Sequence, residues 1–304
     1  MIWPRFHVLW DPRSWAYVAR SGRGYFRREL RRCPCCGSGY YKILSRKSLV
    51  TFLVRCDGCR LLYRIPQDPI ASRSGFYQSG YVSGGLATYL PAPRELTRLL
   101  AAAFRGTDKN FAQKIALFDV LGVPTGARVL DFGASWGYAV WQLQKAGYDA
   151  MGYEIGVSRA DFGRRQLGVE IVSEIDSIRG PFHVVFSSHV LEHLPNPKAA
   201  FELAKRLLGP CGLFIAFTPN GSEIRLRRDK KVYDHSWGRL HPIYLDAAFY
   251  EAALPNIPKL ITSRAYGNWR NIDDIAGWDG KTSRVGDLSG PEMMLVWSND
   301  VQDR

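Results

Sequence analysis

Apolar residues along the chain fall into short runs separated by longer amphipathic stretches, most regularly after about residue 123. The short runs predict buried strands, and the stretches between them predict helices. We expect strands at 128–133, 149–154, 169–173, 182–188 and 212–218, and helices at 137–147, 157–167 and 197–208. Strands that alternate with helices of about 10 residues are typical of an α/β fold with a doubly wound, mostly parallel sheet.

The pattern continues on both sides of this region. The segments "RELTRLLAAAFRG" and "NFAQKIALFDVLG", within residues 94–122, predict helices. Near the C-terminus, "IYLDAAFYEAAL" predicts a helix, and "KLITSRAYG" and "MMLVWS" predict two strands that pair as a β-hairpin at the sheet edge. With these two strands the expected sheet has seven.

A smaller region precedes the sheet. Within residues 33–65 the apolar runs "YYKIL" and "LVTFLVRC" predict the two strands of a hairpin, and the Pro, Gly and Ser residues of 66–93 predict a linker with loops. We expect a basic aromatic arm, a cysteine-rich hairpin, a linker with helices and a main domain, at 1–32, 33–65, 66–111 and 112–304. The chain has no apolar run of about 18 residues, so we expect no transmembrane segment.

Four cysteines of the hairpin are spaced as two C-x-x-C pairs, Cys33 with Cys36 and Cys56 with Cys59. Two residues between cysteines let one tight turn direct both thiolates at a single ion, and two such turns complete the tetrahedral site that structural Zn²⁺ prefers. Because four thiolates leave no open coordination position, we expect the zinc to stabilise a small zinc-ribbon hairpin and to take no part in catalysis. Clustered cysteine pairs favour metal binding in a reducing compartment over an extracellular disulfide framework, so we expect a cytoplasmic protein.

The chain carries 41 Lys and Arg against 28 Asp and Glu, a formal net charge of +13. An excess of this size favours an anionic partner such as a nucleic acid, a phospholipid surface or a phosphorylated substrate. Residues 1–32 contain eight arginines interleaved with aromatic side chains, which suits peripheral contact with a membrane or a nucleic acid. The alternative is a solvated tail whose aromatic residues pack on the main domain.

The segment "RVLDFGASWGYAV", residues 128–140, has a carboxylate at the end of a predicted strand, followed by a turn with two glycines. In an open parallel sheet, ligands bind outside the carboxyl ends of the strands, where Asp131 is expected to lie. Gly133 and Gly137 allow a sharp turn and a close approach to a ligand, and the next helix directs its N-terminal amides into the same space. Glu154 ends the following strand and could accept both hydroxyls of a ribose. These features leave a nicotinamide cofactor and S-adenosylmethionine as candidates.

The spacing distinguishes these two cofactors. A dinucleotide fingerprint is G-x-G-x-x-G, which lets a pyrophosphate rest on bare backbone, whereas the pattern here is D-x-G-x-S-x-G. A carboxylate would repel a pyrophosphate but attract the cationic amino-acid end of S-adenosylmethionine. The pattern therefore favours S-adenosylmethionine.

Three motifs in this order, "VLDFGASWGYAV", "GYE" and "FHVVFSSHVLEHLPNP", resemble the class I S-adenosylmethionine-dependent methyltransferases, especially the group whose fourth strand runs into "VLEHL-D-P". The resemblance covers roughly residues 112–255 and implies a Rossmann-like sheet with S-adenosyl-L-methionine as cofactor. This sequence departs from the family at Ser135, where a second glycine is usual.

The resemblance assigns eight cofactor-binding residues, which are Asp131, Gly133, Ala134, Gly137, Glu154, Ile155, Ser188 and His189. The four residues of the turn would form the pocket for the cofactor's amino-acid end, Glu154 would bind the ribose, and Ile155 would pack on the adenine. Ser188 and His189, after the fourth strand, would line the methyl-transfer face. In the alternative interpretation Asp131 only caps the turn, and the glycines only pack a strand against a helix.

His189, Glu192 and His193 also match H-x-x-E-H, a zinc-peptidase pattern. A peptidase site requires this segment to be a regular helix and needs a third ligand downstream. Here the segment directly follows a predicted strand, and Pro195 and Pro197 interrupt any helix. We therefore reject the peptidase interpretation.

Three residues are candidates for acceptor chemistry: His193, His241 and Tyr244. Neutral imidazole suits proton removal near neutral pH, so His193 could act as a general base, or it could hold its loop by hydrogen bonds. The segment "WGRLHPIYLD" matches a histidine-containing segment common after the fifth strand in this group. That match implies that His241 and Tyr244 reach the acceptor.

The cysteine hairpin bears on the identity of the acceptor. The segments "CPCCGS", "VRCDGCRLLYRIPQDP" and "GFYQSGY" resemble the N-terminal cysteine knuckles of methyltransferases in sugar and surface-polysaccharide pathways. The resemblance implies carbohydrate biosynthesis, with an anionic acceptor such as a nucleotide-sugar or a glycan. The larger sugar C-methyltransferases of this kind carry a further C-terminal domain, so we expect O- or N-methylation.

Two alternatives stay open. Ribosomal-RNA guanine methyltransferases also carry an N-terminal zinc module, and interleaved arginines and aromatic residues suit RNA binding. The chain could also be a catalytically silent binding or scaffold protein, although the intact acidic pair Asp131 and Glu154 argues against that function.

Overall fold

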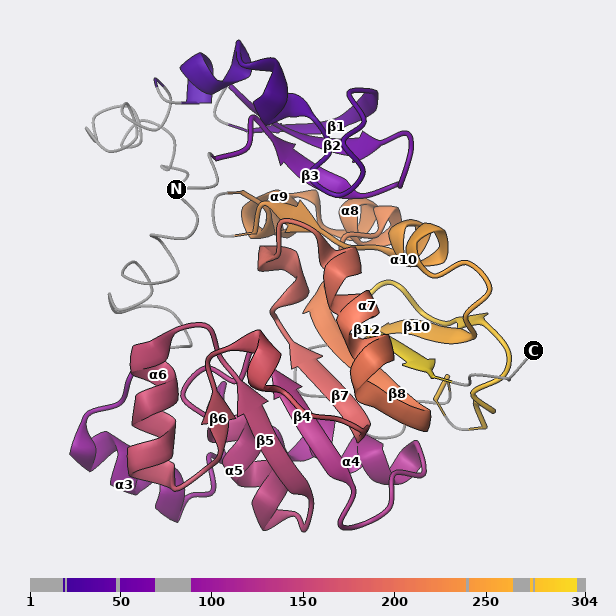
Figure 1. Cartoon of the computed structure of the whole chain (residues 1–304). Coiled ribbons are helices and arrows are strands. Elements are labelled where there is room, and N and C mark those ends of the chain that lie inside the picture. The colour runs from indigo at the N-terminus through magenta and orange to yellow at the C-terminus, as the bar shows by residue number, and fades with distance from the viewer. Residues whose placement is uncertain are drawn as a thin grey trace.

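The computed structural model describes residues 19, 21–47, 50–68, 89–238, 241–264, 274–275 and 277–299. An eight-stranded sheet forms the main domain, with strand order β11-β10-β12-β8-β7-β4-β5-β6 (Figure 1). Its strands are β4 (Arg128–Phe132), β5 (Asp149–Tyr153), β6 (Ile171–Val172), β7 (Phe182–Ser188), β8 (Leu208–Pro219), β10 (Lys259–Arg264), β11 (Arg284–Val285) and β12 (Glu292–Ser298). β12 is antiparallel to both neighbours, and the other neighbouring strands are parallel.

The expected α/β fold with a mostly parallel sheet is confirmed, and the five strands predicted within residues 128–218 are all present, although β8 begins four residues earlier than predicted. The sheet has eight strands rather than seven because the two-residue strand β11 pairs with β10. The two C-terminal strands pair antiparallel as expected, but β12 inserts between β8 and β10.

The helices of the described part connect and cover these strands. They are α3 (Pro93–Ala101), α4 (Ala112–Val120), α5 (Tyr138–Lys145), α6 (Val157–Phe162), α7 (Pro197–Leu207), α8 (Glu223–Arg228), α9 (Lys230–Ser236) and α10 (Ala247–Ala253). The helix predicted at 157–167 ends early and continues as the π-helical turn Gly163–Leu167. The helix predicted from "IYLDAAFYEAAL" begins only at α10, because strand β9 precedes it and the side chain of Asp246 caps it.

Both faces of the sheet are buried because successive residues of each strand point to opposite sides. Leu130 and Phe214 pack on one face together with residues of α7 and α10. Their neighbours Val129 and Ile215 pack on the other face together with residues of α4 and α5. This double burial explains the short, almost continuous apolar runs of the sequence.

Residues 33–65 form a separate small sheet, which we call the N-terminal module. β1 (Tyr41–Lys47) and β2 (Thr51–Cys56) form the predicted hairpin, and β3 (Leu62–Ile65) adds a third antiparallel strand that the sequence did not predict. The fourth strand, β9 (Ile243–Tyr244), comes from the main domain and pairs with β3.

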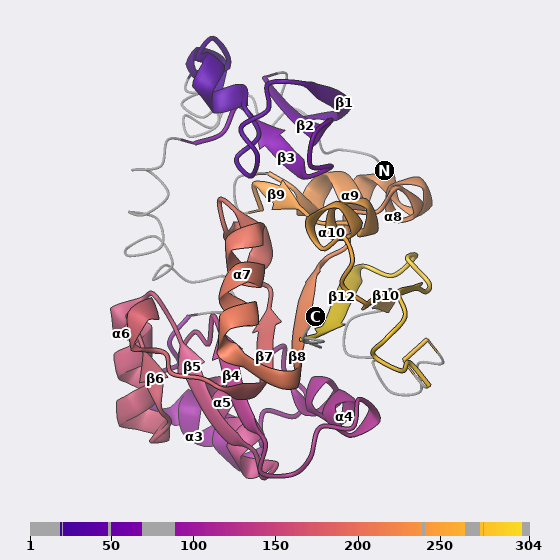
Figure 2. The ribbon, with the colours of Figure 1, turned by 45° about the vertical axis from the view of Figure 1, so that its right-hand side comes forward.

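The N-terminal module lies against α8, α9 and α10, on the side of the molecule where β8 ends (Figures 1 and 2). Two buried side chains link the two parts, since Nη2 of Arg55 lies 2.8 Å from Oδ2 of Asp246. Cys33 and Tyr63 of the module also belong to the same apolar cluster as Phe132 of the main domain. The module therefore packs on the main domain through the segment that follows β8.

Parts of the predicted arm and linker, residues 1–18, 20 and 69–88, lie outside the described residues. Among the residues that the structure describes, no helix combines the length and the apolar character needed to cross a membrane.

Candidate active site

The turn after β4, residues 131–137, is shaped by its two glycines. Gly133 has φ +93°, and a Cβ there would lie 2.2 Å from Cγ2 of Val190, just after β7. Gly137 has φ +82° at the N-cap of α5, and a Cβ there would lie 2.7 Å from Cγ2 of Val169. Both positions need glycine, as the sequence predicts, and the first brings the turn against the chain that follows β7.

Ser135, which replaces the usual second glycine, also lies in the left-handed region, with φ +51°. Its side chain is buried, and its Oγ has no hydrogen-bond partner among the described residues. A buried hydroxyl without a partner is costly, so this turn fits a ligand that brings a polar group to it.

Asp131 lies at the end of β4 and is only 3% exposed. Burial, and then the negative charge of Glu154, raises the pKa of Asp131 from 3.8 to about 7. No described residue donates a hydrogen bond to its carboxylate. A buried carboxylate in this condition is stabilised by a cation, and an ammonium group would supply one.

Glu154 follows β5 and accepts four hydrogen bonds. Oε2 accepts from the backbone N–H of Ser135 at 3.0 Å, and Oε1 accepts from the N–H of Gly156 at 2.7 Å. Oε1 also accepts from Nη2 and Nε of Arg159, at 2.7 and 3.2 Å. These donors use most of the acceptor capacity of the carboxylate, so a ribose would have to share or replace Arg159. The ribose role of Glu154 stays a prediction, as does the adenine contact of the half-exposed Ile155.

Ser188 and His189 belong to a polar network that includes two residues the sequence analysis missed. Nζ of Lys114 donates to Oγ of Ser188 at 3.0 Å and to Oε1 of Glu292 at 2.6 Å. Nε2 of His189 lies 2.8 Å from the same Glu292 oxygen. Burial lowers the pKa of His189, but hydrogen bonding to Glu192 and Glu292 outweighs burial and raises it to about 9. Lys114 and Glu292 come from α4 and β12, so no local motif could have indicated them.

Glu192, His193 and His241 come together beside this network. Their potential ligand atoms all lie within 4.8 Å of one another, and the two imidazole ring centres are 5.0 Å apart. Glu192 is fully buried; its Oε1 lies 3.3 Å from Nδ1 of His189, whereas Oε2 has no hydrogen-bond partner among the described residues. Nδ1 of His241 donates to the backbone carbonyl of Ser236 at 2.7 Å, so a neutral His241 has its lone pair on Nε2.

The segment that holds Glu192 and His193 is a three-residue 3₁₀ turn, Leu191–His193, rather than a regular helix. His189, just before it, has φ +57°. This geometry agrees with the rejection of a peptidase helix. The H-x-x-E-H pattern is nevertheless the sequence signal for Glu192, which is not among the site residues predicted from the sequence.

Tyr244 lies in β9, where successive side chains point to opposite sides. It is buried between the N-terminal module and α9, with its ring centre 4.8 Å from that of Tyr233. Its apolar neighbours are Leu53, Leu62 and Trp237. The structure thus brings His193 and His241 together but places Tyr244 in the packing between the two parts of the molecule.

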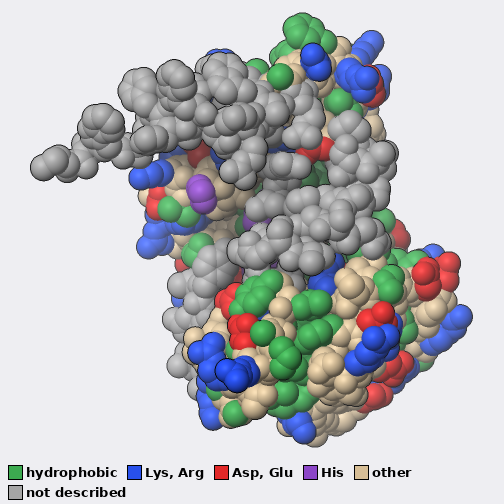
Figure 3. Space-filling view, turned by 90° about the vertical axis from the view of Figure 1, so that its left-hand side faces the viewer, with side chains coloured by type: hydrophobic (Ala, Val, Ile, Leu, Met, Phe, Trp, Pro, Cys, Tyr) green, Lys and Arg blue, Asp and Glu red, His purple; other side chains and the backbone are tan. Residues whose placement is uncertain are grey.

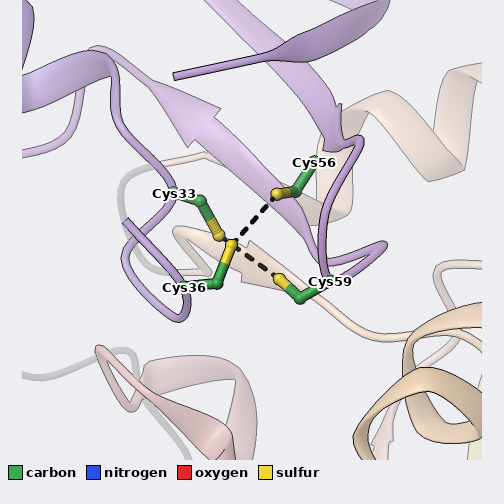
Figure 4. Close-up of side chains that lie close together, drawn as sticks. All are labelled: Cys33, Cys36, Cys56 and Cys59. Carbon is green, nitrogen blue, oxygen red and sulfur yellow. Dashed lines mark hydrogen bonds between the residues drawn. The ribbon is translucent and has the colours of Figure 1, made fainter. Parts of the chain in front are cut away.

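The four cysteines predicted to bind metal converge on one point (Figure 4). Sγ of Cys33 is 3.5 Å from Sγ of Cys59, and Sγ of Cys36 is 3.4 Å from Sγ of Cys56. Tetrahedral zinc with Zn–S bonds of about 2.3 Å places its sulfurs about 3.8 Å apart, so small shifts would complete the site. The residues present therefore fit a structural zinc ion.

A hollow of about 350 Å³ lies beside the N-terminal module, and its lining is basic and aromatic. The lining residues are Arg28, Arg31, Arg32, Gly39, Tyr40 and Tyr41. On the face shown in Figure 3, the described Lys and Arg side chains are spread over the surface and lie among Asp and Glu side chains.

A mostly parallel sheet with a glycine turn and a buried acid at the end of β4 defines an α/β protein that binds a ligand at the carboxyl ends of its strands. Residues 92–255, more than half of the chain, match the family model described as a methyltransferase domain. The chain therefore belongs to this methyltransferase family, and the predicted class, an S-adenosylmethionine-dependent methyltransferase, is confirmed.

A curated relative is the ubiquinone biosynthesis O-methyltransferase of Methylococcus capsulatus, which is 30% identical over 109 residues. The match covers 32% of this chain and 45% of the relative, so the chain spans less than half the length of that protein.

Solved structures with a similar fold include a TehB-like methyltransferase of Corynebacterium glutamicum, with 18% identity and a TM-score of 0.43 over 67% of this chain and 93% of that one. Magnesium protoporphyrin IX methyltransferase of Synechocystis has 14% identity and a TM-score of 0.46 over 76% of this chain and 99% of that one.

Proposed function

We propose that this protein transfers a methyl group from S-adenosylmethionine to an oxygen or nitrogen of a sugar, nucleotide-sugar or glycan. The observation that carries the cofactor assignment is the buried carboxylate of Asp131, which no described residue satisfies, next to the unpartnered hydroxyl of Ser135. When bound, the cofactor supplies an electrophilic methyl group on a sulfonium.

The chain's own residues then hold the two substrates. Asp131 would accept the ammonium group, and the bare backbone of Gly133 and Gly137 would allow the amino-acid end to approach closely. Ser188 and His189 would line the methyl-transfer face, held by Lys114 and Glu292. His193 and His241 would face the acceptor from the side of the N-terminal module.

The acceptor assignment is supported by three features. The N-terminal module resembles those of sugar-pathway enzymes, and it lies where an acceptor would enter. The formal charge of +13 favours an anionic acceptor. The curated relative is named as an O-methyltransferase, which agrees with transfer to oxygen.

Calorimetry tests the cofactor assignment. S-adenosylhomocysteine has the amino-acid end, whereas 5′-methylthioadenosine lacks it. We expect Asp131→Asn to weaken S-adenosylhomocysteine roughly 30-fold, because a hydrogen bond to a charged group contributes about 2 kcal/mol, and to leave methylthioadenosine within about twofold. Equal weakening of both ligands would contradict the proposed position of the ammonium group.

Turnover tests the acceptor. Radiolabelled S-adenosylmethionine should transfer label to a member of a nucleotide-sugar and glycan panel and not to structured RNA. A protein that binds the cofactor and labels no acceptor in either panel would favour the scaffold interpretation.

RNA is the second candidate acceptor, and the hollow beside the N-terminal module favours it. Arginines would contact phosphates there, and Tyr40 and Tyr41 could stack on bases. If RNA binds, affinity should be sub-micromolar and should fall linearly with the logarithm of salt concentration. Weak binding that hardly changes with salt would favour the sugar acceptor.

We also propose that Cys33, Cys36, Cys56 and Cys59 hold a structural zinc ion. Their sulfurs already lie close to a tetrahedral arrangement, and zinc would fix the turns at both ends of the small sheet.

A further inference from the structure

The group formed by Glu192, His193 and His241 is not used by the proposed cofactor site, and it contains a buried carboxylate that has to be compensated. Glu192 is fully buried, and its Oε2 has no hydrogen-bond partner among the described residues. An ionised carboxylate buried in this way costs several kcal/mol unless a cation compensates it. Nδ1 of His189 lies 3.3 Å from Oε1, and this contact leaves Oε2 without a hydrogen-bond donor among the described residues.

The chemistry of the donor set points to a metal ion. One carboxylate oxygen and two imidazole nitrogens lie within 4.8 Å of one another. The hydrogen bond from Nδ1 of His241 to Ser236 orients that ring and leaves Nε2 as an electron-pair donor. Two histidines and one carboxylate are a ligand set that binds first-row divalent metals and leaves coordination positions open.

We propose that Glu192, His193 and His241 bind a divalent first-row metal ion whose open positions take the acceptor's hydroxyl oxygen. The site deepens the proposed function and rests on it, because it assigns O-methylation and a hydroxyl acceptor. The two histidines then act as metal ligands, whereas the sequence analysis considered His193 as a general base or as a residue that holds its loop.

The fold places this site next to the methyl donor. Val190 packs against Gly133 of the glycine turn, and Glu192 follows two residues later. His241 is held from the other side, because the N–H of Arg64 donates to the carbonyl of Pro242 at 2.8 Å and β3 pairs with β9. The N-terminal module thus positions one of the three ligands.

The reaction balances without a protein base. The metal-bound hydroxyl group loses its proton to solvent water, because the imidazole lone pairs are engaged by the ion. The oxygen lone pair forms the new O–C bond to the methyl carbon while the C–S bond breaks. Its electron pair stays on sulfur and gives the neutral thioether.

Manganese distinguishes this site from the cysteine site, because Mn²⁺ prefers oxygen and nitrogen ligands and does not displace zinc from thiolates. Full-length protein with its cysteine site zinc-loaded is titrated with Mn²⁺ and followed by electron paramagnetic resonance. We expect one Mn²⁺ per chain, with ¹⁴N couplings from imidazole in the spin-echo modulation. Absence of saturable binding, or binding without nitrogen couplings, would overturn the proposal.

Glu192→Gln and His241→Ala should each weaken Mn²⁺ roughly tenfold or more, and His241→Ala should reduce the nitrogen couplings. The control is His235→Ala, an exposed histidine on α9, which should leave binding unchanged. Because a buried change at Glu192 could affect folding, the partly exposed His241 provides the independent variant. Unchanged Mn²⁺ binding in both variants would overturn the assignment.

Calorimetry with S-adenosylhomocysteine on the same samples separates this inference from the proposed function. Cofactor binding without Mn²⁺ binding would contradict the metal site alone. Mn²⁺ binding without cofactor binding would contradict the proposed methyl transfer, and with it the role of the metal in binding the acceptor.

Discussion

Asp131 makes cofactor binding depend on pH. Its pKa is about 7 in the cofactor-free protein, so below pH 7 the carboxyl group holds a proton that an incoming ammonium group must displace. We expect the affinity for S-adenosylhomocysteine to fall by up to about tenfold per pH unit as pH decreases below 7. Calorimetry in two buffers of different ionisation enthalpy measures the released proton. In Asp131→Asn the affinity should be lower and independent of pH, and an unchanged slope would assign the proton to another group.

The raised pKa of Asp131 also predicts how the stability of the cofactor-free protein depends on pH. Because the pKa of Asp131 is higher in the folded state than its ordinary 3.8, the folded state gains stability from the bound proton at low pH and loses it as pH rises through about 7. Asp131→Asn should therefore raise the melting temperature at pH 8 and have little effect at pH 4.5. A lower melting temperature at pH 8 would show that the carboxylate is compensated in the free protein.

Substitutions of Gly133 and Gly126 separate the free-energy cost of backbone strain from that of a steric collision. Gly133→Ala should be destabilising both because φ is +93° and because its Cβ would collide with Val190. Gly126→Ala is the matched control, since its φ is +79° but nothing lies within 4 Å of the added Cβ. We expect about 1 kcal/mol for Gly126→Ala and about 1–3 kcal/mol more for Gly133→Ala, measured by urea unfolding. Equal costs would mean that Val190 moves away freely.

At the scale of elements, the N-terminal module depends on its metal. Cys56 is buried at the end of β2, whereas Cys211 is exposed on β8. Cys56→Ser should abolish the thiolate-to-cobalt charge-transfer band of the Co²⁺-loaded protein and lower the melting temperature by several degrees, and Cys211→Ser should do neither. An unchanged melting temperature in Cys56→Ser would mean that apolar packing alone holds the module.

The elements also show what the sequence could and could not indicate. β4 and β7 were predictable because burial on both faces makes each a short apolar run. β9 has two residues and is a strand only because β3 lies beside it, so its local pattern is that of the neighbouring helix. That pairing also determines which way Tyr244 points. The motif match carries no information about the pairing, and it therefore predicts Tyr244 at the acceptor site.

The candidate site likewise contains some residues that the sequence could indicate and others that it could not. Asp131, Gly133 and Gly137 lie in one continuous motif whose geometry follows from local backbone requirements. Nζ of Lys114 lies 2.6 Å from Oε1 of Glu292, although the two residues are 178 positions apart in the sequence. No local sequence pattern could indicate that contact. Glu192 was visible in the sequence, but its grouping with His241 required the fold to bring the chain after β7 next to β9.

At the scale of the whole molecule, one apolar cluster includes cysteines of the N-terminal module and the core of the main domain. The two parts should therefore unfold together rather than in sequence. This arrangement connects the proposed zinc site to the proposed acceptor site, because the strand that completes the small sheet begins two residues after His241.

The buried ion pair between Arg55 and Asp246 tests this connection. Arg55→Met leaves the Asp246 carboxylate buried without its partner and should destabilise the protein by about 3–5 kcal/mol. Adding Asp246→Asn removes the stranded charge and keeps an oxygen that can cap α10, where Oδ1 of Asp246 accepts from the N–H of Phe249. The double variant should therefore recover more than half of the loss in guanidinium unfolding, with a single transition. A loss below 1 kcal/mol in Arg55→Met, or a separate early transition of the module in wild type, would show that the two parts are coupled only weakly.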